Sequence, residues 1–191
     1  VLVLGAAVGV GLAAVDIAKS FGARVVAAVS TKEKAEVCKG YGVDDVVIYG
    51  EEKLNNEGQR ALTKELKSKS VRGGFSVIYD PIGDCFAEPA LRSIGWGGTY
   101  LVVGFAAGKI PSFPTNLMLL KGCAVSGVFI GRFQQEEPQQ NAQNLKEIGE
   151  LLGSGKLTPF ISETIPMSES VDAIERIAKR GVVGKVVFIN D

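Results

Sequence analysis

The sequence predicts an α/β fold built on a doubly wound parallel sheet, and three observations support this prediction. Apolar, strand-like runs alternate with helix-like runs through residues 1–131, which is the pattern of a parallel sheet covered by helices. A glycine-rich turn joins the first strand to the first helix. In the last third of the chain, the apolar runs no longer follow this alternation and indicate helices with short strands. We therefore expect six main strands in residues 1–131 and an extension of helices and short strands in residues 132–191.

Each strand is predicted from a short apolar run that a glycine, a proline or a polar cluster ends. The six expected strands are residues 1–4, 24–29, 45–49, 75–80, 99–103 and 123–129. The helices between them are expected from Leu12 to the closing Gly22, then over 32–40, 59–69 and 85–94, with a helical turn at 117–121 and a loop at 50–58. The extension is expected to hold a helix over 141–152, a strand over 160–165, a helix over 168–179 and a final strand over 185–189.

Composition excludes several classes of function. The 191 residues are 46% hydrophobic and 22% charged with zero net charge, so we expect a full core and neither nucleic acid nor a membrane as partner. No apolar run approaches the roughly 20 residues of a membrane span. The chain has no histidine, which excludes a histidine-containing metal site and a Ser-His-Asp mechanism. We expect no bound metal, three reduced cysteines and a cytoplasmic location.

The glycine-rich turn is the strongest functional signal. A turn between a buried strand and a helix exposes backbone N–H groups at the helix N-terminus, where a pyrophosphate binds well. One dinucleotide frame, G-x-G-x-x-G, falls on Ala6, Val8 and Gly11, and a second, G-x-x-x-G-x-G, falls on Gly5, Gly9 and Gly11. We expect residues 7–10 (Ala7, Val8, Gly9 and Val10) to bind the cofactor, and Val8 to hinder close approach of the backbone to phosphate. A glycine turn that only packs helix on sheet is the alternative.

The end of the second strand indicates which nucleotide binds. NAD-binding proteins usually place an acidic residue there to hold the ribose 2′-hydroxyl. This chain has Ser30 and Thr31, followed by Lys32 and Lys34, and hydroxyls and cations suit a 2′-phosphate better. We therefore expect NADP(H) rather than NAD, with Ser30, Thr31 and Lys34 in the site. The alternative is that the lysines are only solvated charges on a helix.

Several segments together resemble one family, the zinc-free quinone oxidoreductases of the medium-chain dehydrogenase/reductase superfamily. The resemblance covers essentially the whole chain, and it is clearest in residues 5–18, 33–36, 47–49, 79–83, 94–98, 103–111, 116–121, 131–133 and 184–187. It implies a Rossmann-type nucleotide-binding domain preceded by a GroES-like domain. We expect that domain to be missing here, because the chain begins with Val1 inside a strand.

The resemblance also implies further site residues and a partner. Ser30, Lys34 and Tyr49 would surround the 2′-phosphate. Two loops would line the nicotinamide side, formed by Pro81, Ile82 and Gly83 and by Gly104, Phe105 and Ala106. Residues 132–191 would partly complete the absent domain, so we expect 158–165 to be poorly anchored. A homodimer would form through residues 123–129, an apolar edge strand that would otherwise be exposed.

We therefore predict an NADPH-dependent oxidoreductase that transfers hydride to a small molecule, a quinone or an electron-poor enone. No general acid can be assigned, so no catalytic residue is named, and this chain alone is expected to be inactive. A non-catalytic nucleotide-binding module is the main alternative. A short-chain dehydrogenase is weaker, because its Tyr-x-x-x-Lys match, Tyr49 and Lys53, falls in a strand end and loop. A methyltransferase-like site is weaker again, because it would favour an acid after the second strand.

Overall fold

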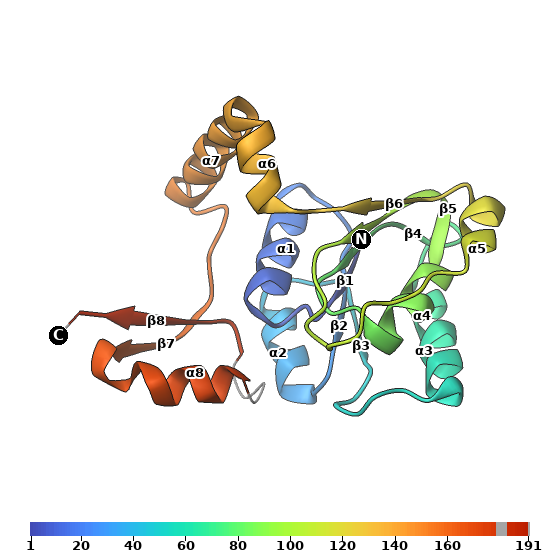
Figure 1. The fold of residues 1–191 in the computed structure, drawn as a ribbon, viewed down its shortest axis with the longest axis horizontal. Coiled ribbons are helices and arrows are strands. Elements are labelled where there is room, and N and C mark those ends of the chain that lie inside the picture. The colour runs from blue at the N-terminus through green and yellow to red at the C-terminus, as the bar shows by residue number, and fades with distance from the viewer. Residues whose placement is uncertain (179–182, 191) are drawn as a thin grey trace.

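The computed structural model describes residues 1–178 and 183–190, and its main feature is one parallel sheet of six strands (Figure 1). The strands are β1 (Leu2–Leu4), β2 (Val26–Val29), β3 (Asp45–Ile48), β4 (Phe75–Asp80), β5 (Ile94–Val102) and β6 (Ala124–Gly127). Their order is β3-β2-β1-β4-β5-β6, and every neighbouring pair is parallel. From β1 the chain adds strands first toward one edge of the sheet (β2, β3) and then toward the other (β4, β5, β6). Folds of this type bind their ligands at the point between β1 and β4 where this order reverses. The predicted fold class is confirmed.

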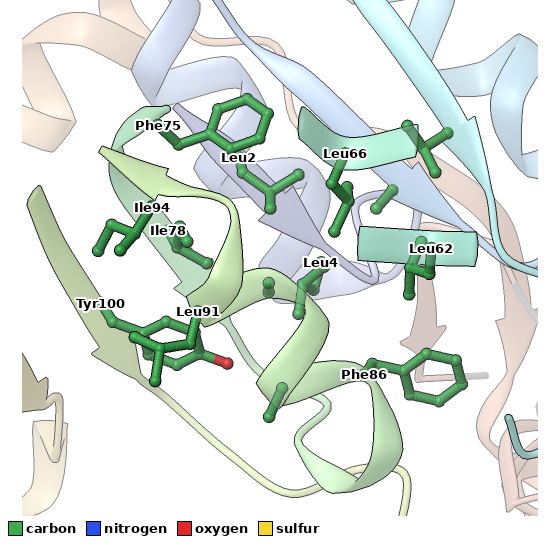
Figure 2. Packing of buried hydrophobic residues seen from close by; sticks show 14 of the residues in the cluster. Leu2, Leu4, Leu62, Leu66, Phe75, Ile78, Phe86, Leu91, Ile94 and Tyr100 are labelled. Carbon is green, nitrogen blue, oxygen red and sulfur yellow. The ribbon is translucent and has the colours of Figure 1, made fainter. Parts of the chain in front are cut away.

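Helices cover both faces of this sheet. On one face lie α1 (Gly9–Ser20) and α2 (Lys32–Gly40), and on the other α3 (Asn56–Lys69), the turn η1 (Asp84–Phe86) and α4 (Ala87–Arg92) (Figure 1). The short helix α5 (Thr115–Lys121) precedes β6. Alternation along β1 assigns its side chains to the two faces, since Leu2 and Leu4 pack with the α3 and α4 side and Val3 packs with the α1 side. Figure 2 shows Leu2 and Leu4 among the side chains of the first cluster.

The remaining chain forms a smaller unit. It contains α6 (Ile130–Glu136), α7 (Pro138–Gly153), β7 (Ile161–Pro166), the turn η2 (Met167–Glu169), α8 (Ser170–Ala178) and β8 (Lys185–Ile189). Strands β7 and β8 pair in parallel as a separate two-stranded sheet. In Figure 1, α6 and α7 project away from the main sheet, and no residue of α7 is buried. The predicted end of the last helix, Lys179, lies outside the described residues.

Several elements differ from the prediction, most clearly around β5, α3 and α6. The helix expected to reach Ile94 ends at Arg92, and β5 begins at Ile94 because this residue pairs with Phe75 ahead of a register shift in the ladder. Helix α3 begins inside the stretch predicted as a loop, because the Asn55 side chain accepts a hydrogen bond of 2.9 Å from the Gly58 N–H and so caps it. Helix α6 was not predicted as an element.

The segment between α7 and β7 is anchored, so the expectation that 158–165 would be poorly held was wrong for the start of that range. Leu157 is buried. The backbone N–H of Thr158 donates to the Asp16 carboxylate at 2.7 Å, and the Tyr41 hydroxyl donates to the Thr158 carbonyl. The segment thus docks on α1 and α2 of the nucleotide-binding fold, because its polar backbone finds partners there.

Candidate functional site

The turn between β1 and α1 has the geometry of an anion site. Gly5 has a left-handed φ of +58°, which favours glycine. A Cβ on Gly11 would stand 2.1 Å from the Gly5 carbonyl oxygen, so only glycine lets α1 approach the turn this closely. Val8 is the N-cap residue and its side chain makes no capping hydrogen bond, while the first turn of α1 carries no acidic residue. The N–H groups and dipole of α1 are therefore left for another acceptor.

A cavity of about 620 Å³ opens at the carboxyl ends of the strands beside this turn. The predicted site residues on its wall are Val8, Gly9, Ser30, Lys34, Tyr49, Ile82 and Ala106. The other predicted residues lie in the same turns but do not line the cavity, namely Ala7, Val10, Thr31, Pro81, Gly83, Gly104 and Phe105. The fold thus brings the three predicted parts of the site, the glycine turn, the end of β2 and the loops after β4 and β5, to one cavity.

The end of β2 presents a hydroxyl and an ammonium group together. The Lys34 Nζ donates to the Ser30 Oγ at 3.1 Å, and both residues line the cavity. Among the described residues, Lys34 forms no ion pair with a carboxylate. Thr31 has a different role, because its Oγ1 accepts a hydrogen bond from the Lys34 N–H at 3.3 Å and caps α2. The ring of Tyr49 packs against Phe86 with centroids 4.6 Å apart.

A buried carboxylate joins the turn after β4 to strand β5. The Asp80 Oδ1 accepts hydrogen bonds from the N–H groups of Ile82 at 2.9 Å and Gly83 at 2.8 Å. Its Oδ2 accepts one from the Tyr100 hydroxyl at 2.6 Å. Burial raises the pKa of Asp80, and these three hydrogen bonds act in the opposite direction. Tyr100 was not predicted for the site, and Asp80 was predicted only as the end of the fourth strand, within the segment 79–83 that carries the family resemblance.

Two residues of the smaller unit reach the glycine turn. The Gly184 N–H donates to the Ala7 carbonyl at 3.0 Å, and the Lys185 Nζ donates to the Gly9 carbonyl at 2.8 Å. Both residues line the cavity. Their positions could not be predicted from spacing, because the contacts span 176 positions in the Lys185 case. The only sequence signal was that residues 184–187 belong to the segments on which the family resemblance rests.

The Tyr-x-x-x-Lys match does not form a proton-transfer pair. Tyr49 and Lys53 lie in the connection between β3 and α3 rather than on a helix. The Lys53 Nζ instead pairs with the Asp84 carboxylate at 2.8 Å. This ion pair and the packing of Tyr49 against Phe86 use both side chains structurally, which argues against the short-chain mechanism.

Other classes of site have little support within residues 1–178 and 183–190. There, no three or more cysteine, aspartate or glutamate side chains cluster so as to hold a metal ion. In the same residues no helix has the length and apolar character needed to cross a bilayer. Cys38, Cys85 and Cys123 are free thiols.

Comparison with known proteins identifies the family. The sequence profile of the zinc-binding dehydrogenases matches residues 9–147, well over half of the chain. Quinone oxidoreductase-like protein 2 of Bos taurus is 35% identical over 191 residues, covering 98% of this chain and 52% of the relative. Its homolog in Nematostella vectensis is 34% identical over 190 residues, covering 98% and 50%. The chain thus spans about half the length of these curated relatives.

Solved structures agree with this result. The quinone oxidoreductase of Thermus thermophilus, solved alone and with NADPH, superposes with a TM-score of 0.81 at 27% identity, over 98% of this chain and 56% of that one. The Escherichia coli quinone oxidoreductase complexed with NADPH gives 0.82 at 24% identity, over 98% of this chain and 56% of that one, which supports the fold. The predicted resemblance is confirmed: the chain belongs to the zinc-binding dehydrogenase family, and quinone oxidoreductase-like proteins are among its relatives.

Proposed function

We propose that this chain is the NADP(H)-binding part of an oxidoreductase that transfers hydride from NADPH to a quinone or an electron-poor enone. The observation that carries the proposal is the cavity at the carboxyl ends of the strands, which has an uncapped helix N-terminus and the Lys34–Ser30 pair on its wall. The Thermus thermophilus relative, whose structure was solved with NADPH, supports the choice of cofactor.

The residues of the cavity fit the charges of this cofactor. The N-terminus of α1 would receive the pyrophosphate, with Lys185 beside it. Ser30 and Lys34 would receive the 2′-phosphate, with Tyr49 close by on the same wall. NADPH supplies the hydride when bound, and this chain's residues bind and orient it. The loops after β4 and β5 would line the nicotinamide side.

A titration with NADPH and NADH tests the cofactor assignment. Lys34→Met removes the cation proposed for the 2′-phosphate. It should weaken NADPH binding about tenfold, as expected for the loss of a charge-assisted hydrogen bond. The affinity for NADH, which lacks this phosphate, should be nearly unchanged. Lys32→Met is the matched control, because Lys32 lies on the same helix but outside the cavity wall. If the wild type binds neither nucleotide, the proposed function is wrong.

A non-catalytic nucleotide-binding module is the second candidate. It is favoured by Val8, a β-branched residue that lines the cavity where phosphate would approach, and by the absence of an assignable general acid among the described residues. Oxidation of NADPH by quinones and enones distinguishes the two candidates when it is measured on a protein of the relatives' full length. Turnover supports the enzyme, whereas nucleotide binding without turnover for any acceptor supports the module. We expect the present chain alone to bind NADPH without turnover.

We also propose a homodimer formed through residues 123–129. Strand β6 lies at the edge of the sheet, and Val128 and Phe129 after it are 43% and 74% exposed. An edge strand with apolar neighbours is well suited to pairing with a second copy. Sedimentation should show a dimer, and a monomer at high concentration would contradict the proposal. The free thiols agree with the reducing cytoplasm as the proposed location. The further proposal that 132–191 completes a catalytic domain can be tested on a protein of the relatives' full length.

A further inference from the structure

The pair formed by Asp80 and Tyr100 is the most deeply buried polar arrangement beside the cavity in the described part of the chain. Asp80 is 1% exposed and Tyr100 is 0% exposed, and Figure 2 shows Tyr100 among apolar side chains such as Leu91 and Ile94. Burying a carboxylate is costly, and an apolar residue of similar size would often stabilise a core as well. The geometry of the hydrogen bonds indicates what the carboxylate contributes instead.

The carboxylate holds the turn after β4 in one conformation. Its Oδ1 binds two successive N–H groups, those of Ile82 and Gly83, so it fixes the turn at two points. Its Oδ2 is held by the Tyr100 hydroxyl from the neighbouring strand β5. Gly83 adopts a left-handed φ of +66° in this turn.

The same turn is bonded to the loop after β5. The Ala106 N–H donates to the Pro81 carbonyl at 3.1 Å, and the Ala107 N–H donates to the Ile82 carbonyl at 2.8 Å. Ile82, Ala106 and Ala107 all line the cavity. A shift of the turn would therefore displace both loops that form this wall. Asp80 itself is absent from the wall, so it acts through these loops.

We propose that Asp80, oriented by Tyr100, is a positioning residue that sets the shape of the nicotinamide-side wall of the cavity. The inference rests on the proposed NADP(H) site. Asparagine should replace aspartate here, because its Oδ1 can accept from both N–H groups of the turn and its Nδ2 can donate to the Tyr100 hydroxyl oxygen. Leucine offers no acceptor and should not replace it.

The experiment compares Asp80→Asn with Asp80→Leu and uses two ligands. Asp80→Leu should weaken NADPH binding at least tenfold. Asp80→Asn should bind NADPH within about threefold of the wild type, a change below the roughly fivefold effect of losing one typical hydrogen bond. Affinity for 2′,5′-ADP, which lacks the nicotinamide half, should be unchanged in both variants. Hydrogen exchange at the Ile82 and Gly83 amides should accelerate in Asp80→Leu and not in Asp80→Asn.

The outcomes separate a positioning role from general destabilisation. Loss of 2′,5′-ADP and NADPH affinity together, or wild-type NADPH affinity in Asp80→Leu, would overturn the inference. If Asp80→Leu does not fold, Tyr100→Phe tests the positioning role instead. This variant removes one hydroxyl, and it should weaken NADPH binding severalfold while leaving the affinity for 2′,5′-ADP unchanged. A wild type that binds neither ligand refutes the proposed function, and unaltered exchange at the two amides refutes the positioning role separately.

Discussion

Lys185 donates a hydrogen bond from its Nζ to the Gly9 carbonyl at 2.8 Å, joining the start of β8 to the first turn of α1. This contact places a cation at the positive end of a helix dipole, an arrangement that is unfavourable unless an anion is also present. Among the described residues, Lys185 forms no ion pair with a carboxylate. A bound pyrophosphate would supply the missing negative charge.

Lys185→Met should therefore weaken the binding of NADPH and of NADH by the same factor, about five- to tenfold for the loss of one charged contact. The effect differs from that of Lys34→Met, which should be confined to NADPH. Fluorescence titration of both nucleotides measures the two factors. Lys156→Met is a suitable control, because Lys156 is exposed and does not line the cavity. Unchanged affinities in Lys185→Met would remove Lys185 from the site.

Val8→Gly should tighten the binding of NADPH about tenfold, as a released steric clash of about one to two kcal/mol would do. The reason is that Val8 lines the cavity directly before α1, where the phosphate would approach. Val8→Ala should give an intermediate affinity, since it removes only the two methyl groups. An unchanged or weaker affinity in both variants would mean that the turn already accommodates phosphate with valine in place.

Gly11→Ala should destabilise the fold by at least about 3 kcal/mol, the upper range for overpacking a tight site. The added Cβ would lie 2.1 Å from the Gly5 carbonyl oxygen and 2.8 Å from the carbonyl carbon, which are backbone atoms that cannot move away cheaply. Gly149→Ala in α7 is the matched control, because a Cβ there meets nothing within 4 Å. The control should be neutral or stabilising by up to about 1 kcal/mol. Urea unfolding of the two variants provides the comparison, and equal midpoints would contradict this account.

Cys38 should be the least reactive of the three thiols. It is 0% exposed, and burial raises the pKa of Cys38 to about 12, so very little thiolate exists at about pH 8. Cys85 and Cys123 are partly exposed and should be alkylated first. Mass spectrometry after brief treatment with iodoacetamide gives the order of modification, and unfolding in urea should make all three cysteines react. Early modification of Cys38 in the native protein would show that the core opens readily at α2.

Elements with strong local signals were predicted well. The turn from β1 to α1 and the alternation of strands with helices depend on residues that are close in sequence, so their pattern could be interpreted directly. The start of β5 at Ile94 was missed because it depends on pairing with Phe75 in another strand. The start of α3 was missed because the Asn55 cap lies in a polar stretch that resembles a loop. These errors arise where a non-local contact or a single side-chain hydrogen bond sets the boundary.

By itself, the sequence determined the fold class, the glycine turn and the hydroxyl and lysine at the end of β2, because each is encoded within a few neighbouring residues. Only the tertiary structure decided that Lys185 reaches Gly9 and that Asp80 meets Tyr100. Those pairs depend on strand order and on the return of the chain end to the glycine turn. Their residues are far apart in the sequence, and they meet only once the sheet has formed and the start of β8 has reached the glycine turn.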